Sequence, residues 1–331
     1  MSIPKISVIM PVYNASKYLF ESINSILNQT YREFEFIILN DNSTDESLLI
    51  LKKFQLQDNR IILINKEKNV GPATLRNEGF ELAKGEFIAL MDADDISDST
   101  RFEKQIEVLK NQKIDLCGTN YTKFGDTIQD EYVKHFEFHN EIKLNFLFGC
   151  YIANPTVMLR KKIILGMKYD STFFPVDDYE LLSRLITNHT FYNIQESLLK
   201  YRWHQTNISQ TKKVDISNLT NTIKYNQFKE IDSTIDSNLI SSAFISNGIK
   251  FPSEIIEIAK TQTIIKKNNI ENKKFDTDLL NIQFEKTLIR TLKKVKNPTI
   301  EYYKFMVEND LLKKLKKIDR IKIYFKCRFN F

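Results

Sequence analysis

Three carboxylates follow directly on a short apolar run within residues 85–95. Residues 87–91 are apolar without interruption, and Asp92, Asp94 and Asp95 come next. Such a run is typical of a strand buried on both faces of a parallel sheet, and ligands of open α/β sheets gather at the carboxyl ends of these strands. The three acids repel one another, and a divalent cation carrying a phosphate would neutralise them. The alternative is a solvated turn in which Asp95 caps the next helix.

Alternating strands and helices must position these acids. The patterns predict strands over residues 5–10, 34–39, 60–64, 86–91 and 114–118, and helices over 15–27, 44–54, 72–83 and 98–110. Ser43 and Thr44 are typical caps for the second helix, and Pro72 suits the first turn of the third. The alternation predicts an α/β fold with a mostly parallel sheet flanked by helices. No dinucleotide-binding glycine motif or phosphate-binding loop motif occurs.

Two further polar segments follow predicted strands, and a third opens a helix. The first strand is followed by Pro11, Val12, Tyr13 and Asn14. Asp41 follows the second strand, and Arg76 lies in the third helix. An aromatic ring and a carboxylate at this edge can stack on a base and accept its imide N–H, and Arg76 can meet phosphate oxygens. Taken singly, Asp41 is better explained by an Asx turn and Arg76 by an exposed helix charge.

Together these segments resemble the family 2 nucleotide-sugar glycosyltransferases with the GT-A fold, whose pattern runs P-V-Y-N, D-D-G-S-T-D, G-x-x-x-A-R-N-x-G and D-x-D-D. The sequence departs from this pattern at three positions, which are Asn40, Asn42 and Leu75. The resemblance implies that Asp41 contacts uracil, so that UDP is the nucleotide. It also implies that Asp92 lies near the ribose, with Ala93 beside it in the nucleotide-sugar site. By the same resemblance Asp94 binds a divalent metal, Mn²⁺ or Mg²⁺, that holds the diphosphate.

A second pair of acids, Asp177 and Asp178, stands directly before a helical apolar pattern. Acids there usually cap a helix. They resemble the family's E-D-x-[DE]-L motif, which implies that Asp178 is the general base and that Asp177 takes a position in the donor site usually held by Glu. A base that deprotonates the acceptor hydroxyl, opposite the departing UDP, implies inversion. The metal and Arg76 would offset the charge of the leaving diphosphate.

Residues 199–209 resemble the Y-R-x-H-x-x-x-x-S segment that closes the active site in this family. The resemblance places Arg202 in the nucleotide-sugar site and makes His204 a second metal ligand or a diphosphate contact. Without it, a lone histidine is more often structural. Residues 145–161 resemble enzymes that extend lipooligosaccharides, among them β-1,3-N-acetylglucosaminyltransferases. The expected reaction moves GlcNAc, or another hexose or N-acetylhexosamine, from a UDP-sugar to a glycan or lipid-linked oligosaccharide in bacterial cell-envelope synthesis.

The resemblance ends near residue 210. We expect a GT-A catalytic domain over residues 1–211, with a nucleotide-sugar half at 1–118 and an acceptor half at 119–211, and a helical region over 212–331. In the last of these, a basic amphipathic tail begins at Leu311. Its apolar residues at helical spacing are Leu312, Leu315, Ile318, Ile321 and Phe325. Lysine and arginine crowd the other positions, so the tail is predicted to lie on an anionic membrane. The alternative is a helix that docks on its own domain.

The composition restricts the remaining classes. With 42% hydrophobic and 27% charged residues the chain is predicted to fold. No stretch approaches the ~20 apolar residues that span a bilayer, and no leader is visible at the start, so we expect a cytoplasmic protein, peripheral on the inner face of the plasma membrane. The net charge of +6 is mild, and no nucleic-acid partner is expected. Cys117, Cys150 and Cys327 predict neither disulfides nor a thiolate metal site.

Two other functions stay open. A nucleotidyltransferase acting on a sugar phosphate would also use a parallel sheet and metal-binding acids, but it normally carries a glycine-rich basic loop after its first strand, which residues 11–14 do not form. A catalytically inactive nucleotide-sugar-binding module would need neither the metal-binding acid nor the base. The presence of both Asp94 and Asp178 argues against such a module.

Overall fold

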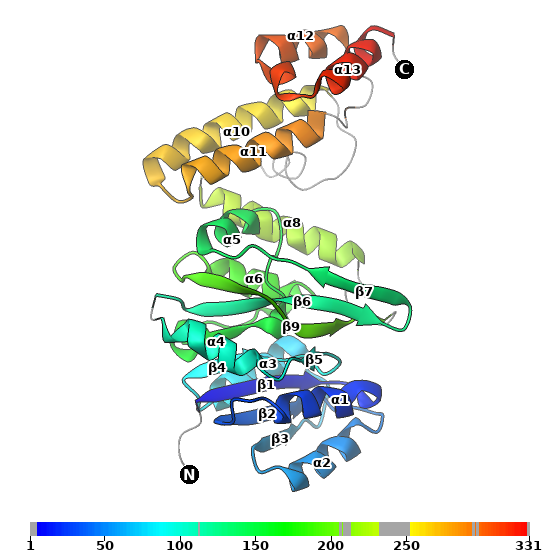
Figure 1. Cartoon of the computed structure of the whole chain (residues 1–331), viewed down its shortest axis with the longest axis vertical. Helices are drawn as coiled ribbons and strands as arrows, with labels where there is room; N and C mark the ends of the chain where they lie inside the picture. Colours follow the sequence, from blue (N-terminus) through cyan, green and yellow to red (C-terminus); the bar gives the residue numbers. More distant parts are fainter. Residues whose placement is uncertain are drawn as a thin grey trace. The chain divides into compact units, whose positions relative to one another are not determined.

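The chain forms two compact units, Met1–Thr220 and Asn221–Phe331 (Figure 1). A computed structural model describes residues 5–111, 113–204, 207, 213–231, 252–292, 295 and 298–329. The boundary predicted between residues 211 and 212 falls outside these residues, and the division into functional halves therefore stays a prediction.

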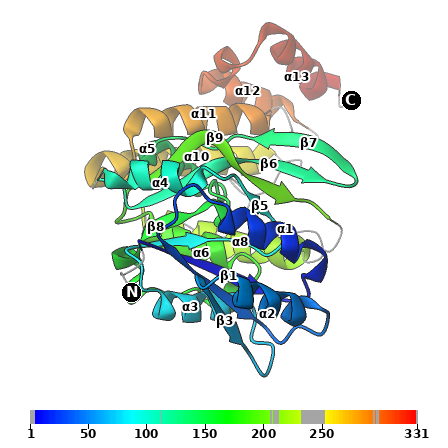
Figure 2. The same ribbon diagram turned by 60° about the horizontal axis from the view of Figure 1, so that its bottom comes forward.

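A nine-stranded mixed sheet forms the first unit (Figure 2). Its strands are β1 Ile6–Val12, β2 Phe34–Asn40, β3 Ile61–Asn65, β4 Phe87–Leu90, β5 Ile96–Ser97, β6 Leu116–Gly125, β7 Ile128–Val133, β8 Met158–Arg160 and β9 Phe191–Arg202. The order is β3-β2-β1-β4-β8-β6-β9-β5, and β7 pairs with β6. The first four strands are parallel, as predicted. Strand β8 then inserts antiparallel between β4 and β6, so the fifth predicted strand is not a direct neighbour of the fourth.

Helices connect these strands. They are α1 Ser16–Leu27, α2 Ser47–Gln57, α3 Pro72–Leu82, α4 Arg101–Lys110, α5 His139–Phe146 and α6 Asp177–Leu185. The predicted caps of α2 are wrong, because the helix begins at Ser47 and not at Thr44. Instead, the Ser43 hydroxyl accepts a hydrogen bond from the Asn14 backbone at 3.0 Å, and the Thr44 N–H donates to the Asn14 side chain at 2.8 Å. These residues join the ends of β1 and β2, a long-range role that local cap preferences do not reveal.

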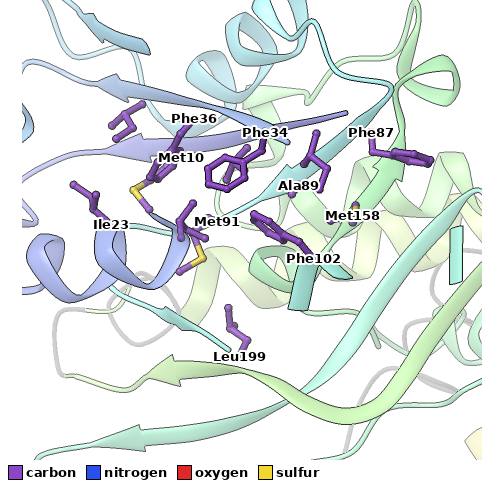
Figure 3. Close-up of a cluster of buried hydrophobic side chains, with 14 of the residues drawn as sticks. Met10, Ile23, Phe34, Phe36, Phe87, Ala89, Met91, Phe102, Met158 and Leu199 are labelled. Atoms are coloured by element: carbon purple, nitrogen blue, oxygen red, sulfur yellow. The ribbon is translucent and has the colours of Figure 1, made fainter. Parts of the chain in front are cut away.

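The apolar core packs on β1, β2 and β4, and β4 leads to the three acids. Met10, Phe36, Ile23 and Met91 belong to one cluster of buried apolar side chains (Figure 3). Burying each large apolar side chain contributes roughly 1.5–3 kcal/mol, so the end of β4 is firmly held. Gly85 allows β4 to begin close to β1, since a Cβ there would lie 2.6 Å from the Ser7 nitrogen.

The second unit is helical in its described residues, as predicted. Its helices are α8 Lys213–Lys229, which crosses the boundary between the units, α10 Pro252–Asn272, α11 Thr277–Leu292, α12 Ile300–Glu308 and α13 Lys317–Phe329. Helices α10 and α11 lie side by side (Figure 1). The Asn269 side chain holds the turn between them, because it donates to the Phe275 carbonyl at 3.0 Å and accepts from the Phe275 N–H at 2.8 Å. This unit packs around its own apolar residues, such as Ile258 and Phe284.

The predicted amphipathic tail is not one continuous helix. A 3₁₀ turn spans Leu311–Lys314, and α13 begins only at Lys317. Leu315 is buried, whereas Ile318 is 60% exposed. The predicted apolar stripe therefore divides between a segment packed on its own unit and an exposed helix face. Among the described helices, none combines the length and the apolar character needed to cross a lipid bilayer.

Candidate active site

The loops after β1 and β2 form one edge of the site. Pro11 and Val12 close β1, and the ring of Tyr13 that follows is 52% exposed. Asn14 adopts a left-handed backbone with φ of 49° and is bonded to the loop after β2. This loop pair presents one accessible aromatic face on a backbone that hydrogen bonds hold in place, which suits stacking on a nucleobase.

Asp41 is buried beneath this edge, with 2% of its surface exposed. One carboxylate oxygen accepts from the Val70 N–H at 2.7 Å, and the other accepts from the Gly71 N–H at 2.8 Å. Gly71 has a φ of +83°, which favours glycine there. Asp41 therefore fixes the loop that opens α3, and a base N–H would use a remaining lone pair of the same carboxylate. The predicted contact with uracil stays a prediction.

Arg76, on α3, joins the two groups of acids that are distant in sequence. Its guanidinium donates to Asp92 at 3.0 Å and lies 3.6 Å from a carboxylate oxygen of Asp177. The side chain is only 11% exposed, which rules out the simple exposed helix charge. Burial alone would lower the pKa of Arg76, but the charges of Asp92, Asp177 and Asp178 contribute to raising it above its ordinary value. The guanidinium is therefore a permanent cation between the two acid motifs.

The acids after β4 occupy different environments. Asp95 is 1% exposed, and one of its oxygens accepts from the Arg202 N–H at 2.8 Å. Its other oxygen has no hydrogen-bond partner in the described part of the chain. Burial and the charges of Asp94 and Asp92 raise the pKa of Asp95 well above its ordinary value. Asp95 does not cap the next helix, because α4 begins at Arg101 after a Thr100 cap position.

The segment at the end of β9 closes over Asp94. The His204 Nε2 lies 3.0 Å from an Asp94 carboxylate oxygen, and the Arg202 Nε donates to the Asp94 carbonyl at 2.7 Å. Arg202 also pairs with Glu21 of α1 at 2.5 Å, and the His204 ring stacks on Tyr18 with ring centroids 5.1 Å apart. The structure thus brings together the two residues predicted to be metal ligands.

Two residues of α1 were not identified from the sequence. Tyr18 and Glu21 are spaced like any helix face, so only their contacts with Arg202 and His204 reveal them. Ser22 on the same helix donates to the Asp92 carbonyl at 3.2 Å. Helix α1 therefore supports the acid motif as well as the core.

Asp94 and His204 fit a metal that binds together with a substrate phosphate. Their side chains are 29% and 20% exposed, so both can be reached from solvent. Among the described residues no group of three or more acids, histidines or cysteines is arranged to hold a metal ion. Mg²⁺ is commonly held by one or two protein carboxylates, with phosphate oxygens and water as the other ligands, and Mn²⁺ accepts similar ligands. The pair is compatible with that arrangement and not with a complete protein-built metal centre.

The acids of the second motif open α6, which begins at Asp177. Asp177 is 3% exposed, and burial raises its pKa while the charge of Arg76 opposes that rise. Asp178 accepts a hydrogen bond from the Tyr179 N–H at 2.7 Å. Burial and then the charge of Asp177 raise the pKa of Asp178 to about 6. At neutral pH this carboxylate is ionised yet close to proton binding, as a general base requires.

A row of half-buried rings lies in the predicted acceptor half. Successive ring centroids are 5.6 Å apart from Tyr201 to Tyr121, 5.6 Å from Tyr121 to His135 and 6.4 Å from His135 to Tyr151. Tyr201 precedes Arg202 of the site. At the other end Cys150 precedes Tyr151, and burial and then the charge of Asp178 raise the pKa of that thiol. The residues come from β6, β9 and two loops, so no sequence pattern marks this row.

The sheet order, the acids at the end of β4 and the helical second unit together define a GT-A fold. The family model described as Glycosyl transferase family 2 matches residues 7–191, more than half of the chain. The chain therefore belongs to glycosyl transferase family 2. The resemblance inferred from the motifs is confirmed.

The relatives are glycosyltransferases of bacteria and archaea. An uncharacterized glycosyltransferase of Methanocaldococcus jannaschii is 39% identical over 210 residues, covering 61% of this chain and 72% of that protein. The O-antigen biosynthesis glycosyltransferase WbnJ of Escherichia coli is 34% identical over 207 residues, covering 60% and 80% respectively. The putative teichuronic acid biosynthesis glycosyltransferase TuaG of Bacillus subtilis is 30% identical over 213 residues, covering 63% and 83%.

Solved structures of similar fold have much lower identity. TarS 1–349 of S. aureus in complex with UDP matches with a TM-score of 0.56 and 17% identity, covering 88% of this chain and 81% of that chain. The mannosyltransferase PcManGT from Pyrobaculum calidifontis, in complex with GDP-Man and Mn²⁺, matches with a TM-score of 0.51 and 10% identity, covering 98% and 85%. At such identities the likeness shows the fold alone.

Proposed function

We propose that the protein transfers a sugar from a UDP-sugar to a hydroxyl of a glycan acceptor, with inversion, in the synthesis of a bacterial cell-envelope polysaccharide. The observation that carries this proposal is the placement of Arg76 between Asp92 of the donor motif and Asp177, next to Asp178 with a pKa of about 6. The names of WbnJ and TuaG support the envelope role. TarS structures with UDP and UDP-GlcNAc support the donor class and make GlcNAc the favoured sugar.

The chemical step needs one base. Asp178 accepts the proton of the acceptor hydroxyl, and the oxygen attacks the anomeric carbon from the face opposite UDP. The bond from that carbon to the diphosphate oxygen breaks, and its electron pair leaves with UDP. A carboxylate with a pKa of about 6 is suited to this transfer, since it is ionised at neutral pH and still binds a proton well.

The leaving group gathers negative charge as this bond breaks. Arg76 is a buried, permanent cation that can donate to diphosphate oxygens once it exchanges part of its contact with Asp92. Asp94 and His204 would hold Mn²⁺ or Mg²⁺, which would supply further positive charge to the diphosphate when bound. Tyr13 offers its exposed ring to the base.

The acceptor is proposed to bind along the row Tyr201, Tyr121, His135 and Tyr151. Ligand sites are commonly lined by aromatic side chains, which offer an apolar face with a polar edge, and a sugar ring presents C–H groups and hydroxyls to such a surface. Burial lowers the pKa of His135 to about 4, so this ring is neutral at physiological pH. An uncharged row of rings favours a neutral glycan over an anionic acceptor at this position.

Glycosyl transfer is tested by measuring UDP release from a panel of UDP-sugars with Mn²⁺ or Mg²⁺, with and without hexose and N-acetylhexosamine glycosides as acceptors. We expect release that depends on the acceptor, a product whose mass has grown by one sugar, and a β anomeric signal in the proton NMR spectrum from an α-linked donor. An α-linked product would overturn single displacement. Diphosphate release from nucleoside triphosphate and sugar phosphate would instead favour the nucleotidyltransferase, and binding without turnover would favour the inactive binding module.

We also propose that the protein works in the cytoplasm as a peripheral protein on the inner face of the plasma membrane, where a lipid-linked acceptor would be accessible. The excess of basic residues in the tail that begins at Leu311 supports this location. A vesicle-binding experiment on α13 tests it below.

A further inference from the structure

Helix α13 has one face that packs on the second unit. Ile323 and Cys327, one helical turn apart, are 7% and 6% exposed. The Tyr324 ring contacts the Tyr303 ring of α12 with centroids 5.3 Å apart. Leu315, just before the helix, is 3% exposed. These residues attach α13 to its own unit. This face therefore fits the alternative predicted from the sequence, a helix that docks on its own domain.

The other apolar face of α13 remains exposed. Ile318, Ile321 and Phe325 are 60%, 47% and 50% exposed. Their spacing of three and then four residues places them on one stripe. With 3.6 residues per turn, this stripe lies on the opposite side of the helix from Ile323 and Cys327. The Phe325 ring contacts the Tyr324 ring with centroids 5.8 Å apart, yet about half or more of each of the three side chains stays open to solvent.

Cations border the stripe on both sides. On the helical wheel Lys322 and Lys326 lie along one border and Lys317 and Arg328 along the other, and all four are exposed. From Leu311 onward the chain has eight basic residues against one acid, Asp319, while the whole chain has a net charge of only +6. The rest of the chain therefore contributes no positive excess.

We propose that α13 lies on an anionic lipid bilayer, with Ile318, Ile321 and Phe325 at the boundary between headgroups and acyl chains. The flanking lysines extend to the lipid phosphates, as long basic side chains do at membrane interfaces. Arg328 borders the stripe while its guanidinium donates to the Tyr324 hydroxyl at 2.5 Å. A second copy of the chain is a poorer occupant, because two such stripes would bring their bordering cations together. This inference rests on the proposed membrane location and identifies the face of α13 that contacts the lipid. It does not depend on the transfer reaction.

The test is flotation of the full chain with vesicles of phosphatidylcholine containing about one third phosphatidylglycerol, compared with pure phosphatidylcholine. We expect binding to the anionic vesicles that weakens as salt screens the cations, and little binding to the neutral ones. The variant I318S/I321S/F325S should bind at least ~10-fold more weakly, because most of the apolar area is lost.

A matched control changes three equally exposed isoleucines of α10 and α11 in the same unit. These are Ile264, Ile270 and Ile282, with 48%, 63% and 49% exposure. I264S/I270S/I282S should float like the unchanged protein. The charge variant K317Q/K322Q/K326Q should also lose binding, whereas K260Q/K267Q/K286Q, at exposed lysines of α10 and α11, should keep it. Transfer to a soluble glycoside should be unchanged in all four variants, which separates this test from the proposed function.

Three results would overturn the proposal. The first is that the unchanged protein does not float with anionic vesicles, and the second is that the serine variant floats as well as the unchanged protein. The third is that light scattering finds a dimer that the serine variant converts to a monomer. The last result would assign the stripe to a second copy of the chain. Circular dichroism checks that each variant is folded, and the charge variant tests the proposal if the serine variant is not.

Discussion

The acids that follow β4 and the acids that open α6 contact the same guanidinium of Arg76, but their surroundings differ. After β4 the acid motif also contacts Arg202, His204 and the Ser22 hydroxyl. At α6 the cation in contact, among the residues that the structure describes, is Arg76, which lies 3.6 Å from Asp177. The Asp178 carboxylate accepts a hydrogen bond from the Tyr179 N–H. The acids after β4 therefore have arginine and histidine contacts that the described residues do not provide to Asp178, while burial raises the pKa of Asp92, Asp95 and Asp178 alike.

This difference is the basis of the separate roles proposed for Asp94 and Asp178. Asp94 has His204 beside it and a side chain that is 29% exposed, which is compatible with the proposed metal contact. Asp178 has its pKa raised to about 6 by burial and by its neighbour Asp177. Different surroundings of two acids in one site are a common basis for separate chemical roles. Substitution of Asp178 and substitution of Asp94 should therefore have different effects on turnover and on binding.

The largest expected effect is that of Asp178→Asn. The amide cannot accept the acceptor proton, so kcat should fall by at least ~10²- to 10⁴-fold, the usual contribution of a general base. UDP-sugar affinity should remain close to that of the unchanged protein, because the substitution keeps the size of the side chain. Kinetics give the first quantity and calorimetry gives the second. Asp126→Asn is the matched control, since that carboxylate is 89% exposed. If kcat changes less than tenfold, Asp178 is not the base.

Asp94→Asn should have the next largest effect. It should weaken UDP binding and leave the proton transfer to Asp178 unchanged. Loss of this ligand should weaken UDP binding in the presence of Mn²⁺ by at least ~10-fold. Binding measured with a chelator present should hardly change, because the metal contributes nothing there. His204→Gln should act in the same direction. Wild-type affinity and metal dependence in both variants would make the pair a structural contact and leave Arg76 as the main charge on the diphosphate.

The sequence was sufficient to predict the strand that leads to the three acids, because its signals are local. An apolar run followed by acids predicted a strand over 86–91, and β4 spans Phe87–Leu90 with Asp92, Asp94 and Asp95 just beyond it. The order of the first elements followed from the same periodicities. Residues whose role is set by the chain nearby were thus recognisable from type and spacing.

What the sequence could not predict depends on contacts between distant segments. Ser43 was expected to cap a helix, but its hydroxyl accepts from the Asn14 N–H, 29 positions away, while it donates to the nearby Asn40 side chain. Strand β5 is two residues long and pairs with β9 far along the chain, so it has no pattern of its own. The link from Arg76 to Asp177 crosses 101 positions. Likewise, the sequence of the tail predicted a single apolar stripe along one helix. In the structure a break before Lys317, where α13 begins, divides this stripe.

The smallest effect, and the sharpest test of the comparison, is expected from Asp177→Asn. The charge of Asp177 is the second cause, after burial, that raises the pKa of Asp178. Asp178 acts as a base only when deprotonated, so kcat/KM of the unchanged protein should fall as the pH drops below about 6. Removing the neighbouring charge makes ionisation of Asp178 easier, and this acidic limb should therefore move to lower pH.

The height of that pH profile answers a separate question. Asp177→Asn also removes one partner of Arg76, so the plateau of kcat/KM can change without any change in the base. The position of the limb is the decisive reading, because it follows the pKa of the base, whereas the plateau also depends on binding and positioning. Profiles of both proteins should be measured at constant ionic strength, with the Asp126→Asn control giving an unshifted limb. A limb that stays in place or moves to higher pH would mean that the charge of Asp177 does not raise the pKa of Asp178. The raised pKa of Asp178 would then be caused by burial alone.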